Sequence, residues 1–216
     1  MLHSTKRQKY TMNILLGLFG LVNVWFFLIE GEIRVPSHYM YSRFDDLIPF
    51  VPAFIVPYYI WYLYQATPMI YFYFKSYESF CKLMMFSVLS FTIANIVYMI
   101  YPNGIFLRPS VLPDNLFGNW VAFTYLKDSP VNSAPSLHVL MSIATHVSIA
   151  DYGSLRKRRW VVWSSFALMI IICMSTVFVK QHSIVDVIMG SGIGYLLYLL
   201  IYRRKSYSKS LATEYR

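Results

Sequence analysis

A histidine and an aspartate four residues apart lie at the boundary of two long apolar runs near the end of the sequence. They are His182 and Asp186, in the segment Ser175-Thr-Val-Phe-Val-Lys-Gln-His-Ser-Ile-Val-Asp. Residues four apart share one face of a helix, so the carboxylate can hold one ring nitrogen and leave the other free to attack phosphorus. A carboxylate this close to a bilayer needs a partner and is a functional-site candidate. The alternative is an interfacial histidine, with Asp186 paired to another helix.

A second histidine opens another apolar run, in Pro135-Ser136-Leu137-His138. The start of a helix exposes unpaired N–H groups and the positive end of its dipole, so Ser136 lies where a phosphate can bind. His138 can donate a proton to a leaving oxygen because an imidazole changes its protonation near neutral pH. Two simpler roles remain open: Ser136 as a helix N-cap and His138 as a hydrogen-bonded interfacial side chain. With the first pair, these residues indicate phosphoryl transfer through a histidine nucleophile.

Basic side chains near the two histidines are candidates for holding the oxygens of a phosphoryl group. Lys180 precedes the proposed nucleophile by two positions, where fixed positive charge would stabilise the transferring group. It can equally extend its ammonium group to lipid headgroups. Arg108, in the segment 102–135, is a further candidate because its planar guanidinium suits phosphate. Asp45 and Asp46 could touch the substrate, but they are expected in a solvated loop.

The composition places these residues in a membrane protein. Of the 216 residues, 57% are hydrophobic and only 13% are charged, which is too apolar for an ordinary soluble domain. The net charge of +9 could suggest nucleic acid, but the basic residues lie between apolar runs and are expected to set membrane topology instead. Cys81 and Cys173 share no metal-ligand spacing and are too few for a disulfide framework. No metal ion, cofactor or nucleic acid is therefore predicted, and the lipid bilayer is an expected partner.

Six apolar runs are predicted to cross the membrane and to form one all-α domain over residues 1–216. The second run contains several prolines, which predict kinks or a broken helix there. The fourth covers only about 22 Å at the usual helical rise, so its start is expected inside a protein-lined cavity below the outer surface. The first is too long for a signal-peptide core and has no cleavage site after it, so it is expected to remain as an anchor. The six runs are approximately 12–29, 50–72, 83–101, 136–150, 160–179 and 183–202.

The distribution of basic residues predicts the orientation of this bundle. An even number of crossings places both termini on one side, and that side collects 14 of the 19 lysines and arginines, against 5 on the other. The positive-inside rule therefore puts the termini in the cytoplasm. The two histidines, Asp186 and the 102–135 segment then share the extracytoplasmic face. The cytoplasmic set consists of Lys6, Arg7, Lys9, Lys75, Lys82, residues 156–159, residues 203–205, Lys209 and Arg216.

Taken together, these residues resemble the type 2 phosphatidic acid phosphatase (PAP2) superfamily. Its three motifs are Lys-x6-Arg-Pro, Pro-Ser-x-His and Ser-Arg-x5-His-x3-Asp. The second is present at Pro135–His138, and the third has Ser175, His182 and Asp186 at the family's spacing. The resemblance implies a six-helix membrane fold with an outward-facing site and no metal. It also implies that His182 forms a phosphohistidine, His138 protonates the leaving group and Asp186 orients the nucleophile.

The sequence departs from the family pattern at two cations. The first motif keeps Arg108-Pro109 but has Tyr101 in place of its lysine, and the third has Thr176 in place of its arginine. Lys180 is expected to replace one of them, and the resemblance places Ser175 with the phosphate-binding residues. The Ser-Thr-Val-Phe-x-Lys-Gln-His form is similar to the branch of sphingomyelin and inositol phosphorylceramide synthases, which move a phospho-headgroup between lipids. A site with fewer cations should favour a phosphodiester, which carries one negative charge, over a monoester, which can carry two.

Three functions follow as expectations. The first is a metal-independent lipid phosphatase that acts on a lipid phosphate through a phosphohistidine, in the bacterial cytoplasmic membrane with its site facing outward. The second is a headgroup transferase or phospholipase C-like enzyme of the same superfamily that acts on a phosphodiester lipid. The third is a transporter of lipids or ions, which the sequence disfavours because no repeated half is visible.

Overall fold

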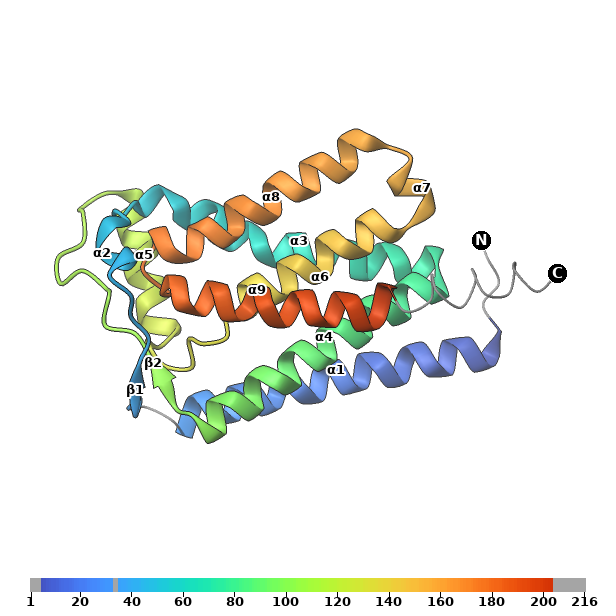
Figure 1. The fold of residues 1–216 in the computed structure, drawn as a ribbon, viewed down its shortest axis with the longest axis horizontal. Helices are drawn as coiled ribbons and strands as arrows, with labels where there is room; N and C mark the ends of the chain where they lie inside the picture. Colours follow the sequence, from blue (N-terminus) through green and yellow to red (C-terminus); the bar gives the residue numbers. More distant parts are fainter. Residues whose placement is uncertain (1–4, 33–34, 204–216) are drawn as a thin grey trace.

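The computed structural model describes residues 5–32 and 35–203, and in this part of the chain the fold is a bundle of long helices that run along one axis (Figure 1). The long helices are α1 (Lys6–Glu32), α3 (Ile55–Lys75), α4 (Tyr77–Ile100), α6 (Leu137–Asp151), α8 (Arg159–Phe178) and α9 (Ile184–Tyr198). The basic residues Arg34, Arg204, Lys205, Lys209 and Arg216, which entered the orientation argument, lie outside the described residues.

Short elements gather mainly at one end of the bundle (Figure 1). The strands β1 (His38–Tyr39) and β2 (Asn103–Gly104) pair in parallel there, beside α2 (Phe44–Leu47) and α5 (Leu116–Lys127). The turn α7 (Gly153–Arg156) lies at the opposite end. The remaining elements are a 3₁₀ turn, η1 (Pro52–Phe54), and a π-helical turn, η2 (Leu199–Arg203). Apart from the two-residue strand pair, the all-α prediction is confirmed for the described residues.

Within the described residues, four helical segments are long and apolar enough to cross a membrane, which supports an integral membrane protein. They are α1, α4, α8 and the segment Ile184–Arg203, which joins α9 to η2. α6 is also apolar but has only 15 residues, which agrees with the short fourth run predicted at 136–150. α3 has 21 residues, but its many tyrosines and Gln65 make it less apolar. The arrangement with six crossings and cytoplasmic termini stays a prediction.

The proline-rich second run breaks before its helix begins, as predicted. Pro52 starts η1, and α3 follows from Ile55. Pro57 lies in the first turn of α3, where the missing N–H would have no intrahelical partner in any case. Pro68 is inside the helix, and its side chain is buried. The break turns the chain so that α3 can present its aromatic residues to the interior.

The 102–135 segment, predicted as a loop, contains the 12-residue helix α5. Asn115 caps it by accepting a hydrogen bond from the Gly118 N–H at 2.9 Å. Such an N-cap stabilises a helix start and is the local signal that sequence reasoning missed. α5 forms part of the wall of the site described below.

Two glycines bring α9 close to α6, which sets the distance between the predicted catalytic residues. A Cβ on Gly190 would lie 3.0 Å from the Ser136 carbonyl oxygen and 3.2 Å from Cβ of Val139. A Cβ on Gly194 would lie 2.8 Å from Cδ1 of Ile143. Small residues four apart allow this kind of close helix packing within a membrane. The starts of α6 and α9 are therefore held side by side.

Candidate active site

His182 lies in the turn between α8 and α9 and contacts Asp186, as the spacing predicted. Its Nδ1 is 3.1 Å from Oδ2 of Asp186, a buried carboxylate in the first turn of α9. The same oxygen accepts a hydrogen bond from the Ser183 N–H at 3.0 Å, so Asp186 also belongs to the capping box of the helix. With Nδ1 held by the carboxylate, Nε2 is the nitrogen available for attack.

The backbone of Thr176 supports the turn that carries this histidine. Its carbonyl oxygen accepts hydrogen bonds from the N–H groups of Gln181 at 3.0 Å and His182 at 3.1 Å. Its hydroxyl donates back to the Cys173 carbonyl at 2.8 Å. Ser175 is fully buried, and its hydroxyl donates to the Ile172 carbonyl at 2.6 Å. The side chains of both residues therefore bond to their own helix, and the structure does not bring the Ser175 hydroxyl to the histidines.

His138 lies in the first turn of α6 and faces His182. The ring centroids of the two histidines are 5.8 Å apart, close enough for one phosphoryl group to contact both. The His138 ring also packs against Tyr58 and Trp61, with centroid separations of 4.3 and 4.2 Å. Its Nε2 is buried and has no hydrogen-bond partner among the described residues. The geometry thus fits a proton donor to a group placed between the rings.

Ser136 occupies the N-cap position of α6, but its side chain makes no capping hydrogen bond. Its N–H donates to the Asp186 carbonyl oxygen at 3.2 Å, which ties the starts of α6 and α9 together. Its hydroxyl is fully buried and has no partner within the described chain. The structure therefore brings Ser136, His138, His182 and Asp186 together from two separate runs.

A cavity of about 550 Å³ extends from the two histidines into the bundle. Helices α1, α3, α4, α5 and α6 all contribute to its wall, which combines aromatic side chains with a few polar groups. This size and character are typical of a small-molecule site. Besides the two histidines, the side chains with ionisable acidic or basic ends that line it are Glu30, Lys127 and Asp128, apart from the tyrosines.

Arg108 lies behind Gln181 and is not among the residues that line the cavity. Its guanidinium donates to the Asp128 carbonyl at 2.7 Å, to the Tyr125 carbonyl at 3.3 Å and to Oε1 of Gln181. It also stacks 4.3 Å from the Tyr125 ring centroid. Burial lowers the pKa of Arg108 and the Asp128 carboxylate acts in the opposite direction, but an arginine stays protonated. Arg108 is thus a fixed positive charge behind the wall of the site.

Lys180 adopts a positive φ of 53° and turns its side chain away from the cavity. Its ammonium group donates to the carbonyl oxygens of Asp45 at 2.9 Å and Ile48 at 2.6 Å. Burial lowers the pKa of Lys180, whereas the charges of Asp45 and Asp46 raise it. The structure therefore places Lys180 as a link to the segment before η1, and does not bring it to the predicted phosphate position.

Asp45 is the residue that sequence reasoning missed. Expected in a solvated loop, it is only 1% exposed and holds the turn that carries His182. Its carboxylate accepts hydrogen bonds from the Ser183 hydroxyl at 2.6 Å and from the N–H groups of Ile184 and Ser42, both at 2.8 Å. No local pattern could have paired residues 138 positions apart.

Comparison with protein-family models matches residues 83–210 to the PAP2 superfamily, which is more than half of the chain. This range includes every predicted site residue: Arg108, Ser136, His138, Ser175, Lys180, His182 and Asp186. No curated protein and no solved structure matches the chain. The narrower likeness to the sphingomyelin and inositol phosphorylceramide synthases stays a prediction. Both the site geometry and the matched range lead to one conclusion: the chain belongs to the PAP2 superfamily.

Proposed function

We propose that the protein cleaves a phosphate ester of a membrane lipid by transferring the phosphoryl group to His182. The observation that carries this proposal is that His138 and His182 face each other on the wall of one cavity, with Asp186 bonded to the His182 ring. Family membership supports a phosphatase-like activity. The substrate would enter from the bilayer with its phosphate between the two histidines and its tails in the lipid.

The reaction follows from the hydrogen bonds of the site. Nε2 of His182 attacks phosphorus, the bond from phosphorus to the leaving oxygen breaks, and His138 gives its proton to that oxygen. Asp186 accepts the hydrogen bond from Nδ1–H and offsets the positive charge of the ring. Water then attacks phosphorus, returns a proton to His138 and releases His182 as the phosphorus–nitrogen bond breaks. The Ser136 hydroxyl and the start of α6 would contact the phosphate oxygens.

The side chains at the family's cation positions support a phosphodiester as a second candidate substrate. The Tyr101 ring stacks on His38 at 3.9 Å, the Thr176 hydroxyl bonds to its own helix, and Lys180 bonds to two carbonyls. A monoester can carry two negative charges near neutral pH, whereas a diester carries one. The second candidate function is therefore cleavage of a phosphodiester lipid, with water or a lipid hydroxyl as the acceptor.

The proposal is tested with purified protein in detergent and a panel of lipid monoesters and diesters. His182→Ala is expected to lower turnover by about 10⁴-fold or more, since it removes the nucleophile. His146→Ala is the matched control, because its ring contacts Ser165 on α8 and not the cavity. The family resemblance implies that no metal is needed, so turnover should persist in EDTA.

The products separate the candidates. Inorganic phosphate indicates the monoester phosphatase, a released phospho-headgroup indicates the phospholipase C-like enzyme, and a new phospholipid that requires an added lipid alcohol indicates the transferase. Full turnover in His182→Ala would contradict the mechanism. Movement of lipid across vesicles without bond cleavage would instead support a transporter.

A further inference from the structure

Two carboxyl groups from separate parts of the chain line the cavity. Glu30, near the end of α1, and Asp128, directly after α5, both line it and repel each other electrostatically. Neutral donors hold them: the Ser129 hydroxyl contacts Glu30 at 3.1 Å, and Asp128 accepts from the Tyr58 hydroxyl at 2.8 Å. No ion pair joins either carboxylate to a residue of the described chain.

The two nearby basic side chains, Arg108 and Lys127, contact other groups and form no ion pair with these carboxylates within the described chain. Arg108 attracts Asp128 electrostatically, but its guanidinium N–H groups bond to two carbonyls and to Gln181. Lys127 lines the cavity, but it is an exposed residue whose ammonium lies 5.9 Å from the Phe123 ring centroid. Two like charges in one cavity are stabilised when a ligand supplies the opposite charge.

Unpartnered polar atoms in the same wall indicate that a ligand completes it. Asn132 lines the cavity and is only 6% exposed, yet neither its amide nitrogen nor its amide oxygen has a partner among the described residues. Nε1 of Trp61, which is also 6% exposed and lines the cavity, is likewise buried and unpartnered. Buried polar groups without partners are rare, and each one requires an explanation such as a bound ligand.

Aromatic rings supply a further feature that suits a cation. Tyr58, Tyr59, Trp61 and Tyr62 of α3 line the cavity with the two carboxylates. The faces of such rings attract ammonium groups. Carboxylates and ring faces together are the chemistry that recognises a positively charged amine, and they are unsuited to a second phosphate charge.

We propose that this part of the cavity binds the ammonium group of a zwitterionic phosphodiester headgroup, with Glu30 and Asp128 as its counter-ions. The inference rests on the proposed function, because the phosphate of the same headgroup lies at His182. Glu30 lies outside the range that matches the PAP2 superfamily, so the site is argued from this chain's own residues. A monoester dianion would instead place two more negative charges in the cavity that holds both carboxylates.

The test compares two short-chain phosphodiester lipids of nearly equal shape, one with an ethanolamine and one with a propanol headgroup. Their affinities are measured in detergent on His182→Ala protein, which cannot turn them over. Glu30→Gln is added to remove one carboxylate. Glu32→Gln is the matched control, because it removes the same charge two residues along α1 from an exposed position that does not line the cavity.

The ethanolamine lipid is expected to bind about tenfold more tightly, a difference of about 1.4 kcal/mol. Glu30→Gln should abolish that preference, and Glu32→Gln should keep it. Equal affinities for the two lipids, or a preference that survives Glu30→Gln, would overturn the inference. The proposed function fails by a different result, which is the absence of phosphate-ester cleavage by the unsubstituted enzyme with any lipid.

Discussion

Two buried carboxylates, far apart in the sequence, hold His182 and the residues that follow it, and His182 is the nucleophile of the proposed mechanism. Asp186 bonds directly to the His182 ring, while Asp45 bonds to the Ser183 hydroxyl and the Ile184 N–H that follow it. Lys180 joins the same assembly through the Asp45 carbonyl. At the residue scale the turn that carries His182 is therefore fixed from both sides, and in the proposed mechanism Asp45 is a positioning residue.

Asp45→Asn is expected to lower kcat about tenfold and the free energy of unfolding by about 1–3 kcal/mol. The amide keeps the shape of the side chain but loses the charge and one acceptor for the buried donors. Asp46→Asn is the control, because Asp46 is exposed and accepts its hydrogen bond from the Tyr41 hydroxyl, not from the turn that carries His182. A variant that loses stability but keeps its kcat would restrict Asp45 to a structural role.

At the element scale the site depends on how closely α6 and α9 approach each other. His138 begins one helix and His182 precedes the other, and the Ser136 N–H bonds to the Asp186 carbonyl between them. Gly190 permits this contact, since its α-carbon faces the backbone of Ser136. The separation of the two histidines is thus a property of helix packing.

Gly190→Ala is expected to reduce kcat about tenfold while the protein remains folded. The new Cβ would lie 3.0 Å from the Ser136 carbonyl oxygen, so the helices must separate by a few tenths of an ångström. Small displacements of catalytic groups are costly, and about 1 Å can lower a rate 100-fold. Gly192→Ala is the matched control, because a Cβ added at that position would have no atom within 4 Å. Equal activity of the two variants would show that this contact does not set the geometry.

The elements were predictable where a periodic or apolar signal extends over many residues. The six runs match α1, α3, α4, α6, α8 and α9, and the proline break before α3 was expected. α5 was missed because its only local signal is the single N-cap Asn115. The two-residue strands were missed because they form only through a contact between distant segments.

For the site, the sequence predicted which groups come together, but not the directions of the side chains around them. The spacing placed His182 beside Asp186, and the two histidines do meet across one cavity. The directions of Lys180, Arg108 and Ser175 could not be foreseen, because each depends on a backbone carbonyl that becomes its partner. Residues that match a motif position can therefore contact the protein instead of the substrate.

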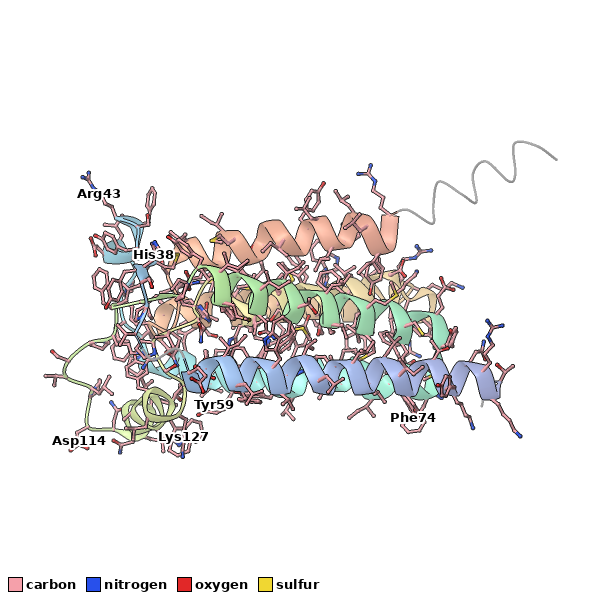
Figure 2. The ribbon with its side chains drawn as sticks, turned by 90° about the horizontal axis from the view of Figure 1, so that it is seen from below. His38, Arg43, Tyr59, Phe74, Asp114 and Lys127 are labelled. Atoms are coloured by element: carbon pink, nitrogen blue, oxygen red, sulfur yellow. The ribbon has the colours of Figure 1, made fainter. Side chains whose placement is uncertain are left out.

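At the scale of the whole molecule, the surface of the bundle is suited to lipid. Leu21, Phe27 and Leu28 of α1 are each more than 60% exposed, and large exposed apolar residues occur on other long helices as well. Figure 2 places His38, Arg43, Asp114 and Lys127 at one end and Phe74 toward the other. Lys127, at the first of these ends, is one of the residues that line the cavity.

A cysteine-labelling experiment tests the predicted orientation. In protein that carries Cys81→Ser and Cys173→Ser, Asp114→Cys should react with a membrane-impermeant maleimide in intact spheroplasts. Lys157→Cys should react only after the membrane is opened, because the positive-inside rule assigns residues 156–159 to the cytoplasm. Both positions are exposed, so access through the membrane decides the result. The reverse labelling pattern would show that the protein has the opposite orientation in the membrane.

The position of Glu30 on α1 has a consequence for how the headgroup preference proposed above could change. α1 packs mainly on α4 and lies outside the family-matched range, whereas the three residues proposed to act in catalysis, His138, His182 and Asp186, lie within that range. A change in α1 can therefore alter which headgroup is accepted without moving the histidines. Selection, in nature or in the laboratory, could therefore change the preferred headgroup through substitutions in one helix.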